Sequence, residues 1–141
     1  MKIKLLYEDA YAPTRGSEQA AGLDLYAYDD IDKEHEFLIR PGEMLKINTG
    51  IAIALDPGTA ALILPRSGLA TKKGLRPANT PGLIDADYRG PVIVALRNDS
   101  KATRSPSIKA LLLTGAFPKI RSTELNVELS IRAIPIAQPH D

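Results

Sequence analysis

The sequence predicts an all-β domain with little helix. Short apolar runs of three to seven residues alternate with breaks rich in proline and glycine. The eleven prolines disfavour long helices, because proline has no backbone N–H and fixes φ. Before Ser107, no stretch of twelve or more residues shows the i, i+3, i+4, i+7 apolar spacing of an amphipathic helix. Many short strands at regular intervals are typical of a β-sandwich, a jelly roll or a barrel.

The predicted strands follow one another closely along the chain. They cover residues 3–7, 23–28, 37–39, 44–47, 51–55, 60–64, 92–96, 108–113 and 125–131. Four breaks between them contain glycine, and three of the four also contain proline, at 40–42, 48–50, 56–58 and 89–91. We expect a turn at each of these breaks, since proline presets φ and glycine accepts positive φ.

A length of 141 residues is that of one ordinary domain, so we expect a single domain over 1–141. The net charge of +1 leaves no broad basic field, which argues against direct binding of nucleic acid. The absence of cysteine excludes disulfides and thiolate zinc sites, and the two histidines, His35 and His140, make a histidine cage a poor prospect. Any metal is expected to be a hard ion with oxygen ligands.

The N-terminal segment reaches the acidic Glu8 and Asp9 before any long apolar run develops. It therefore lacks the pattern of a signal peptide or of a membrane span. We expect a soluble intracellular protein, cytoplasmic or nuclear, that does not associate with membranes.

The first motif, at 21–27, reads AGLDLYA. Alternation would turn Leu23, Leu25 and Ala27 towards a core and Asp24 towards the opposite face. Taken alone, a strand carboxylate of this kind is most simply a solvated residue.

The second motif, at 65–70, reads PRSGLA and follows the apolar run 60–64. An arginine, a hydroxyl and backbone N–H groups at a strand end can converge on an anion, although a plain turn with a surface arginine gives the same pattern. No Walker loop is present in the chain. The neighbouring Lys72 and Lys73 either add positive potential to such a site or belong to a solvated loop.

The third motif, at 79–90, reads NTPGLIDADYRG. Its first four residues predict a turn, and a hairpin there would expose backbone groups able to read the edge of a base. Beyond the turn, Asp85 can hold a water molecule and Tyr88 offers a flat face to a sugar or a base. The residues indicate a small-molecule site without assigning a reaction.

In this order, the three motifs resemble the signature motifs of the trimeric dUTPase family, over about residues 3–100. The resemblance implies a dUTPase-like distorted jelly-roll barrel. It also implies hydrolysis of dUTP to dUMP and pyrophosphate, which limits uracil incorporation into DNA and supplies dUMP for dTMP synthesis. The family uses Mg²⁺ and forms homotrimers with active sites between subunits, where the third motif and the first two come from different chains.

The resemblance also assigns roles near the phosphates. Asp24 corresponds to the carboxylate that lies near the triphosphate and its Mg²⁺, which it reaches through water. Arg66, Ser67 and Gly68 correspond to the phosphate-binding residues of the second motif.

Within the third motif, Asn79 and the backbone of Gly82 and Leu83 correspond to the turn that reads uracil. Asp85 corresponds to the carboxylate that orients and activates water, and Tyr88 to the ring that packs on the deoxyribose and excludes a 2′-hydroxyl. Water aligned with the α-phosphate, Mg²⁺ and N–H donors suffice for phosphoryl transfer, which needs positioning more than covalent help.

The segment 101–141 diverges from the family pattern. After Asp99 the family continues with a Gly-Asp-Arg-Ile-Ala-Gln segment and later with a glycine-rich arm that closes over the nucleotide, and neither stands here in register. A change of reading frame near Arg104 and genuine divergence both account for this. The alternative function is a catalytically weak or inactive dUTPase-like nucleotide-binding or regulatory protein. The dCTP deaminases share the fold, but their third motif lacks the sequence DADYRG.

Overall fold

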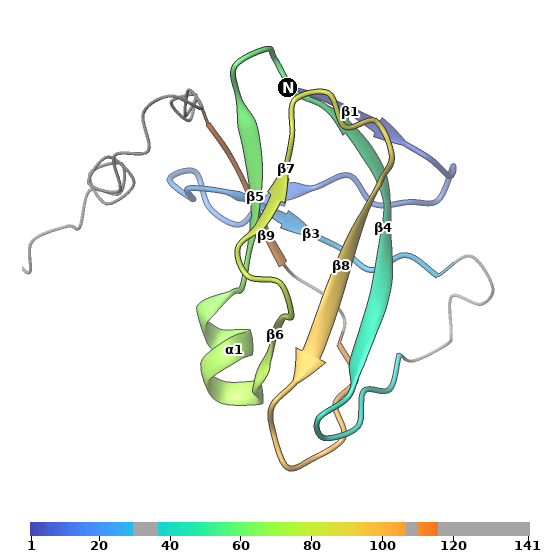
Figure 1. The fold of residues 1–141 in the computed structure, drawn as a ribbon, viewed down its shortest axis with the longest axis vertical. Helices are drawn as coiled ribbons and strands as arrows, with labels where there is room; N and C mark the ends of the chain where they lie inside the picture. Colours follow the sequence, from blue (N-terminus) through green and yellow to red (C-terminus); the bar gives the residue numbers. More distant parts are fainter. Residues whose placement is uncertain (30–36, 107–109, 116–141) are drawn as a thin grey trace, which may run out of the picture.

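The computed structural model describes residues 1–29, 37–106 and 110–115, which form two antiparallel β-sheets and one short helix (Figure 1). The first sheet has the strand order β1-β4-β8-β6 and comprises β1 (Lys2–Leu5), β4 (Met44–Ala54), β8 (Pro91–Asn98) and β6 (Leu75–Pro77). The second has the order β2-β3-β9-β5-β7 and comprises β2 (Thr14–Arg15), β3 (Leu23–Leu25), β9 (Ala110–Gly115), β5 (Ala60–Leu64) and β7 (Gly82–Ile84). The predicted all-β fold with little helix is confirmed.

One hydrophobic core joins the two sheets. In β8, buried residues alternate with more exposed ones, which is the period of two expected when one face of a strand packs inward. The first sheet contributes Ile47, Ile51, Ile53, Leu75, Val92, Val94 and Leu96 to the core, and the second contributes Leu25, Ala61 and Ile63. The core therefore fixes how β7 and β8, which belong to different sheets, lie relative to each other.

The helix α1 (Ser67–Lys73) directly follows β5 and leads into β6, so it connects the two sheets at one end of the molecule (Figure 1). It ends at Gly74, whose φ of 68° is the left-handed conformation that commonly terminates helices. Among the described residues, no helix is long and apolar enough to cross a membrane.

The turns predicted at 40–42 and 56–58 are confirmed. The Glu43 N–H donates to the Arg40 carbonyl at 3.0 Å, and the Thr59 N–H donates to the Asp56 carbonyl at 3.1 Å. The strand predicted at 60–64 is β5, and the strand predicted at 92–96 lies inside β8.

The turn predicted at 48–50 is wrong, because one strand, β4, covers 44–47 and all but the last residue of 51–55. The register of β4 against β8 shifts between Asn48 and Ala52, as in a β-bulge. Asn48 Oδ1 accepts a hydrogen bond from the Gly50 N–H at 2.9 Å, and Thr49 Oγ1 donates to the Val92 carbonyl at 2.7 Å. Gly50 has φ 71°. The bulge therefore uses the positive φ that glycine allows, which is the same property on which the predicted turn was based.

The strand predicted at 37–39 is also wrong, since only Ile39 forms an isolated bridge, with Arg104. Part of the strand predicted at 108–113 is present in β9, which runs from Ala110 to Gly115. The strand predicted at 125–131 lies outside the described residues.

Candidate functional site

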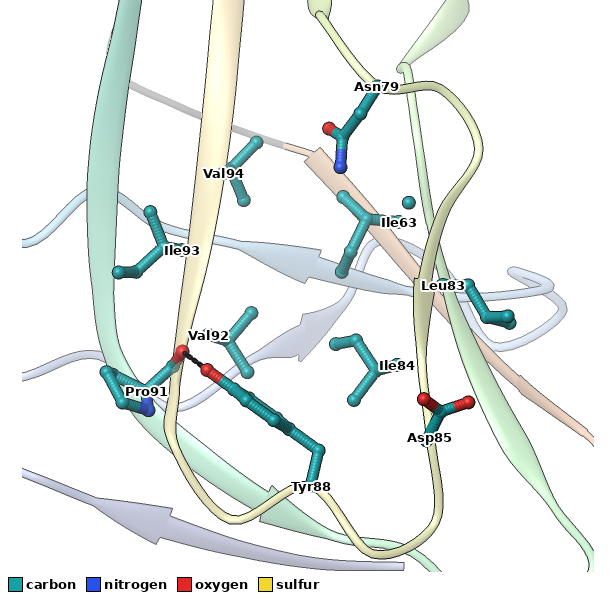
Figure 2. Close-up of a pocket in the computed structure, with 11 residues that line it drawn as sticks. Ile63, Asn79, Leu83, Ile84, Asp85, Tyr88, Pro91, Val92, Ile93 and Val94 are labelled. Atoms are coloured by element: carbon teal, nitrogen blue, oxygen red, sulfur yellow. Dashed lines mark hydrogen bonds between the residues drawn. The ribbon is translucent and has the colours of Figure 1, made fainter.

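A pocket of about 210 Å³ lies between β7 of the second sheet and β8 of the first (Figure 2). Its lining comprises Ile63, Asn79, Gly82, Leu83, Ile84, Asp85, Tyr88, Pro91, Val92, Ile93 and Val94. Apolar side chains form the walls, while Asn79 stands at one end and Asp85 and Tyr88 at the other (Figure 2). An apolar pocket with a few polar groups at its ends is the usual form of a small-molecule site. All five site residues predicted from the third motif line it.

The turn that carries Asn79 is not the predicted hairpin, because the strands on either side of it belong to different sheets. Before the turn, β6 pairs with β8, and the Ala78 N–H donates to the Ala95 carbonyl at 2.7 Å. After the turn, β7 pairs with β5. The turn, which includes a cis peptide between Thr80 and Pro81, therefore crosses from one sheet to the other.

The strand β7 is the last strand of its sheet, so its outer edge has no neighbouring strand among the described residues. An edge strand presents backbone N–H and C=O groups that its own sheet leaves unpaired. A Cβ on Gly82 would come within 3.3 Å of the Ile63 Cβ and 3.5 Å of Asn79 Nδ2. The tighter of the two contacts is with Ile63, so a side chain at this position would press on the pocket wall formed by Ile63.

Asp85 and Tyr88 are connected through the backbone of a short turn. The Tyr88 N–H donates to the Asp85 carbonyl at 3.2 Å, and the Tyr88 hydroxyl donates to the Pro91 carbonyl at 2.9 Å (Figure 2). Tyr88 remains 43% exposed despite these contacts, and Asp85 is exposed as well. Both groups are therefore accessible to a ligand in the pocket.

A second cluster brings the first two motifs together. Asp24 lies in β3, and its Oδ1 is 3.4 Å from Nε of Arg66. The Asp24 residue is only 4% exposed, which differs from the solvated carboxylate that the strand pattern alone suggested. A buried carboxylate is normally paired, and the Arg66 guanidinium provides the partner here.

Arg66 is also the N-cap of α1, with an extended backbone at φ −75° and ψ 131°. The first hydrogen bonds of the helix run from the Leu69 and Ala70 N–H groups to the Arg66 carbonyl. The N–H groups of Ser67 and Gly68 precede these bonds, and such N–H groups suit an anion. Lys72 and Lys73 lie in the last turn of α1, at the end opposite Ser67.

The two clusters are separate within one chain, since Asp24, Arg66, Ser67 and Gly68 do not line the pocket between β7 and β8. The structure thus brings residues of the first and second motifs into one cluster, whereas the residues of the third motif form a separate cluster. Sequence reasoning missed the contribution of β8, whose Pro91, Val92, Ile93 and Val94 form one wall. Only the packing of the two sheets against each other, which the shared core fixes, reveals this wall.

The sequence model of the dUTPase family matches residues 8–105, which include both clusters. The chain belongs to the dUTPase family. It is 49% identical over 96 residues to the deoxyuridine 5'-triphosphate nucleotidohydrolase of Hydrogenobaculum sp., a match that covers 68% of this chain and 63% of that protein. It is 44% identical over 100 residues to the nucleotidohydrolase of the same name from Nautilia profundicola, covering 71% of this chain and 66% of that protein. The chain thus spans slightly less than two thirds of the length of these two relatives.

A longer match is found with the protein of the same name from Trichodesmium erythraeum, which is 40% identical over 130 residues. This match covers 89% of the chain and 87% of that protein, so it includes part of the segment that follows Ser100.

Solved structures agree on the fold. The dUTPase of phage phi11 of S. aureus superposes with a TM-score of 0.70 at 19% identity, over 89% of this chain and 95% of that chain. A mutant dUTPase of Staphylococcus bacteriophage 80alpha with dUpNHpp also has a TM-score of 0.70, at 20% identity, over 89% of this chain and 87% of that one. At these identities the similarity establishes the dUTPase fold alone.

Proposed function

We propose that the chain hydrolyses dUTP to dUMP and pyrophosphate, and so acts within the cell, in the cytoplasm or nucleus, where its nucleotide substrate is found. The observation that carries the proposal is the pocket between β7 and β8 in a chain of the dUTPase family. Asn79, Gly82, Leu83, Asp85 and Tyr88 come from one short segment and line this single pocket.

Base recognition falls to the outer edge of β7 and to Asn79. The backbone of Gly82 and Leu83 lies on an edge strand, whose free N–H and C=O groups can pair with the polar edge of uracil. Tyr88 is 43% exposed, and its ring offers a face to the deoxyribose. Packing of this ring against the sugar leaves no space for a 2′-hydroxyl.

Asp85 is the proposed catalytic carboxylate. It orients a water molecule in line with the α-phosphorus and accepts a proton as the water oxygen attacks. The bond between the α-phosphorus and the bridging oxygen breaks, and pyrophosphate leaves. This chemistry requires positioning and charge neutralisation, and no covalent intermediate on the protein.

The second cluster is the proposed site of phosphate and Mg²⁺ binding. Among the described residues, no group of three or more histidine, aspartate and glutamate side chains gathers, so a cage made only of protein ligands does not fit. An ion held by substrate phosphates and water does fit, because Mg²⁺ commonly takes only one or two protein carboxylates, and Asp24 supplies one. When bound, the ion would neutralise phosphate charge. A mutant dUTPase of phage phi11 coordinates a structural Mg(II) ion.

Assembly would unite the two clusters. Since the phosphate-binding residues do not line the base pocket of the same chain, we propose a homotrimer in which a second copy brings Asp24 and Arg66 to the pocket. Sedimentation or light scattering of the purified protein tests this assembly. A monomer would contradict both the assembly and the shared site.

The deciding experiment measures pyrophosphate release from dUTP with and without Mg²⁺. Release that depends on Mg²⁺, with dCTP, dTTP and UTP as poor substrates, supports the proposal. Binding of dUpNHpp without any hydrolysis of dUTP would instead favour the alternative of a catalytically inactive nucleotide-binding protein. Absence of both binding and turnover would overturn the proposed function.

A further inference from the structure

The backbone of the segment 85–91 is held by its own hydrogen bonds. The Tyr88 N–H donates to the Asp85 carbonyl, and Arg89 Nη1 donates to the Ala86 carbonyl at 2.6 Å and to the Tyr88 carbonyl at 2.9 Å. The Tyr88 hydroxyl is fixed separately, by its bond to the Pro91 carbonyl. The Tyr88 ring is therefore held at both ends, by its backbone and by its hydroxyl.

Gly90 lies directly against this ring. A Cβ built on Gly90 would stand 2.5 Å from Tyr88 Oη, 2.7 Å from Cζ and 3.1 Å from Cε2. These separations are far below ordinary van der Waals contact, whose optimum is about 3.5 to 4.0 Å between carbon atoms. Any residue larger than glycine therefore competes with the ring for the same space.

The backbone of Gly90 does not itself require glycine. The described glycines with positive φ are Gly42, Gly50, Gly58 and Gly74, so Gly90 has a conformation open to alanine. The nearest obstacle to a side chain at this position is the ring of Tyr88.

We propose that Gly90 is a specificity-determining positioning residue. Because it has no Cβ, the Tyr88 ring can occupy the position in which it discriminates deoxyribose from ribose. The proposal rests on the proposed function of the pocket. With alanine at 90, the side chain of Tyr88 yields before the backbone does, because Asp85 and Arg89 hold that backbone. The ring leaves the Pro91 carbonyl, and the wall that excludes a 2′-hydroxyl is displaced.

The test compares the affinities of dUpNHpp and its ribose counterpart, measured by calorimetry on the full chain with Mg²⁺. Wild type is expected to prefer the deoxy analogue. Gly90→Ala should reduce that preference about tenfold, the scale of a lost small contact in a pocket. Gly58→Ala is the control, because Gly58 has nothing within 4 Å of its virtual Cβ and a φ of 81°, so it strains the backbone without contacting Tyr88.

A double-mutant cycle with Tyr88→Ala separates positioning of the ring from a general structural effect. Once the ring is removed, Gly90→Ala should change neither the preference nor the folding of the protein. An equal effect of Gly90→Ala with and without the ring overturns the inference, and so does an unchanged preference in the single variant. Misfolding of Gly90→Ala that Tyr88→Ala does not relieve overturns it as well. If the wild-type protein binds neither analogue, the proposed function is wrong, and the inference that rests on it is wrong as well.

Discussion

The Nε atom of Arg66 lies 3.4 Å from Oδ1 of Asp24, so the N-cap of α1 and the middle residue of β3 form an ion pair. The side chain of Asp24 is 6% exposed in this pair, and that of Arg66 is 43% exposed. The buried carboxylate thus holds the Nε edge of the guanidinium, while the Arg66 side chain remains partly exposed to solvent. This arrangement orients Arg66 before any phosphate arrives.

Replacing Asp24 by asparagine should weaken both stability and phosphate binding. The free energy of unfolding is expected to fall by about 1 kcal/mol, since Arg66 is partly exposed and solvent screens the pair. Urea unfolding measures this change. The Mg²⁺ concentration that gives half-maximal turnover of dUTP should also rise. Unaltered Mg²⁺ dependence would argue against the role of Asp24 near the metal.

Replacing Asp85 by asparagine should reduce turnover by orders of magnitude and leave nucleotide binding intact. The amide keeps the shape of the carboxylate but accepts no proton, and loss of a general base costs on the order of 10² to 10⁴ in rate. Steady-state kinetics and dUpNHpp binding separate the two effects. Asp87→Asn is the matched control, because Asp87 is an exposed carboxylate of the same turn that does not line the pocket. Equal loss of turnover in both variants would refute a specific role for Asp85.

Asn98 should be among the residues most important for stability. Its side chain is fully buried, and Nδ2 donates to the Ile39 and Ala102 carbonyls, both at 2.8 Å. Its Oδ1 accepts from the N–H and the hydroxyl of Ser100. Asn98→Leu keeps the branched shape of the side chain but leaves these groups unpaired, at a cost of about 3 kcal/mol.

Chemical denaturation measures that cost. Ser100→Ala removes the hydroxyl alone and should cost about 1 kcal/mol, which makes it the comparison. A leucine variant as stable as Ser100→Ala would show that the buried amide is not the organising group of this loop.

The sequence predicts those parts of the fold that local chemistry decides. The turns at 40–42 and 56–58 close through hydrogen bonds between residues three apart in sequence, and their glycines have φ of 77° and 81°. The segment 48–50 carries the same kind of residues but forms a bulge, because β4 continues along β8 through it. Pairing with β8, a strand distant in sequence, decides that outcome, and no local pattern contains it.

The candidate site likewise has parts that local sequence determines and parts that depend on contacts between distant segments. The residues of the third motif are near neighbours in sequence, so their association in one pocket was predictable. The wall formed by β8 was not, because it depends on how the core aligns two sheets. The burial of Asp24 was missed for a related reason. The strand pattern shows which face a side chain occupies, but not that Arg66 covers that face.

Stability should also depend on pH through Asp99. Hydrogen bonds from Arg76, at 2.6 Å, and from Arg97, at 2.9 Å, hold the pKa of the Asp99 carboxyl below its ordinary value of 3.8. A carboxyl with a lowered folded-state pKa stabilises the fold above its unfolded pKa, and this contribution is lost as the pH falls through the folded pKa. Asp99→Asn should therefore lower the urea midpoint at pH 7, and the difference from wild type should shrink as the pH drops below 3.8. Asp56→Asn is a suitable control, since the Asp56 side chain is 76% exposed and forms an ion pair with the N-terminal amine rather than with an arginine. A difference between wild type and Asp99→Asn that stays constant from pH 7 to below 3.8 would show that the two arginines do not stabilise the charged form of Asp99.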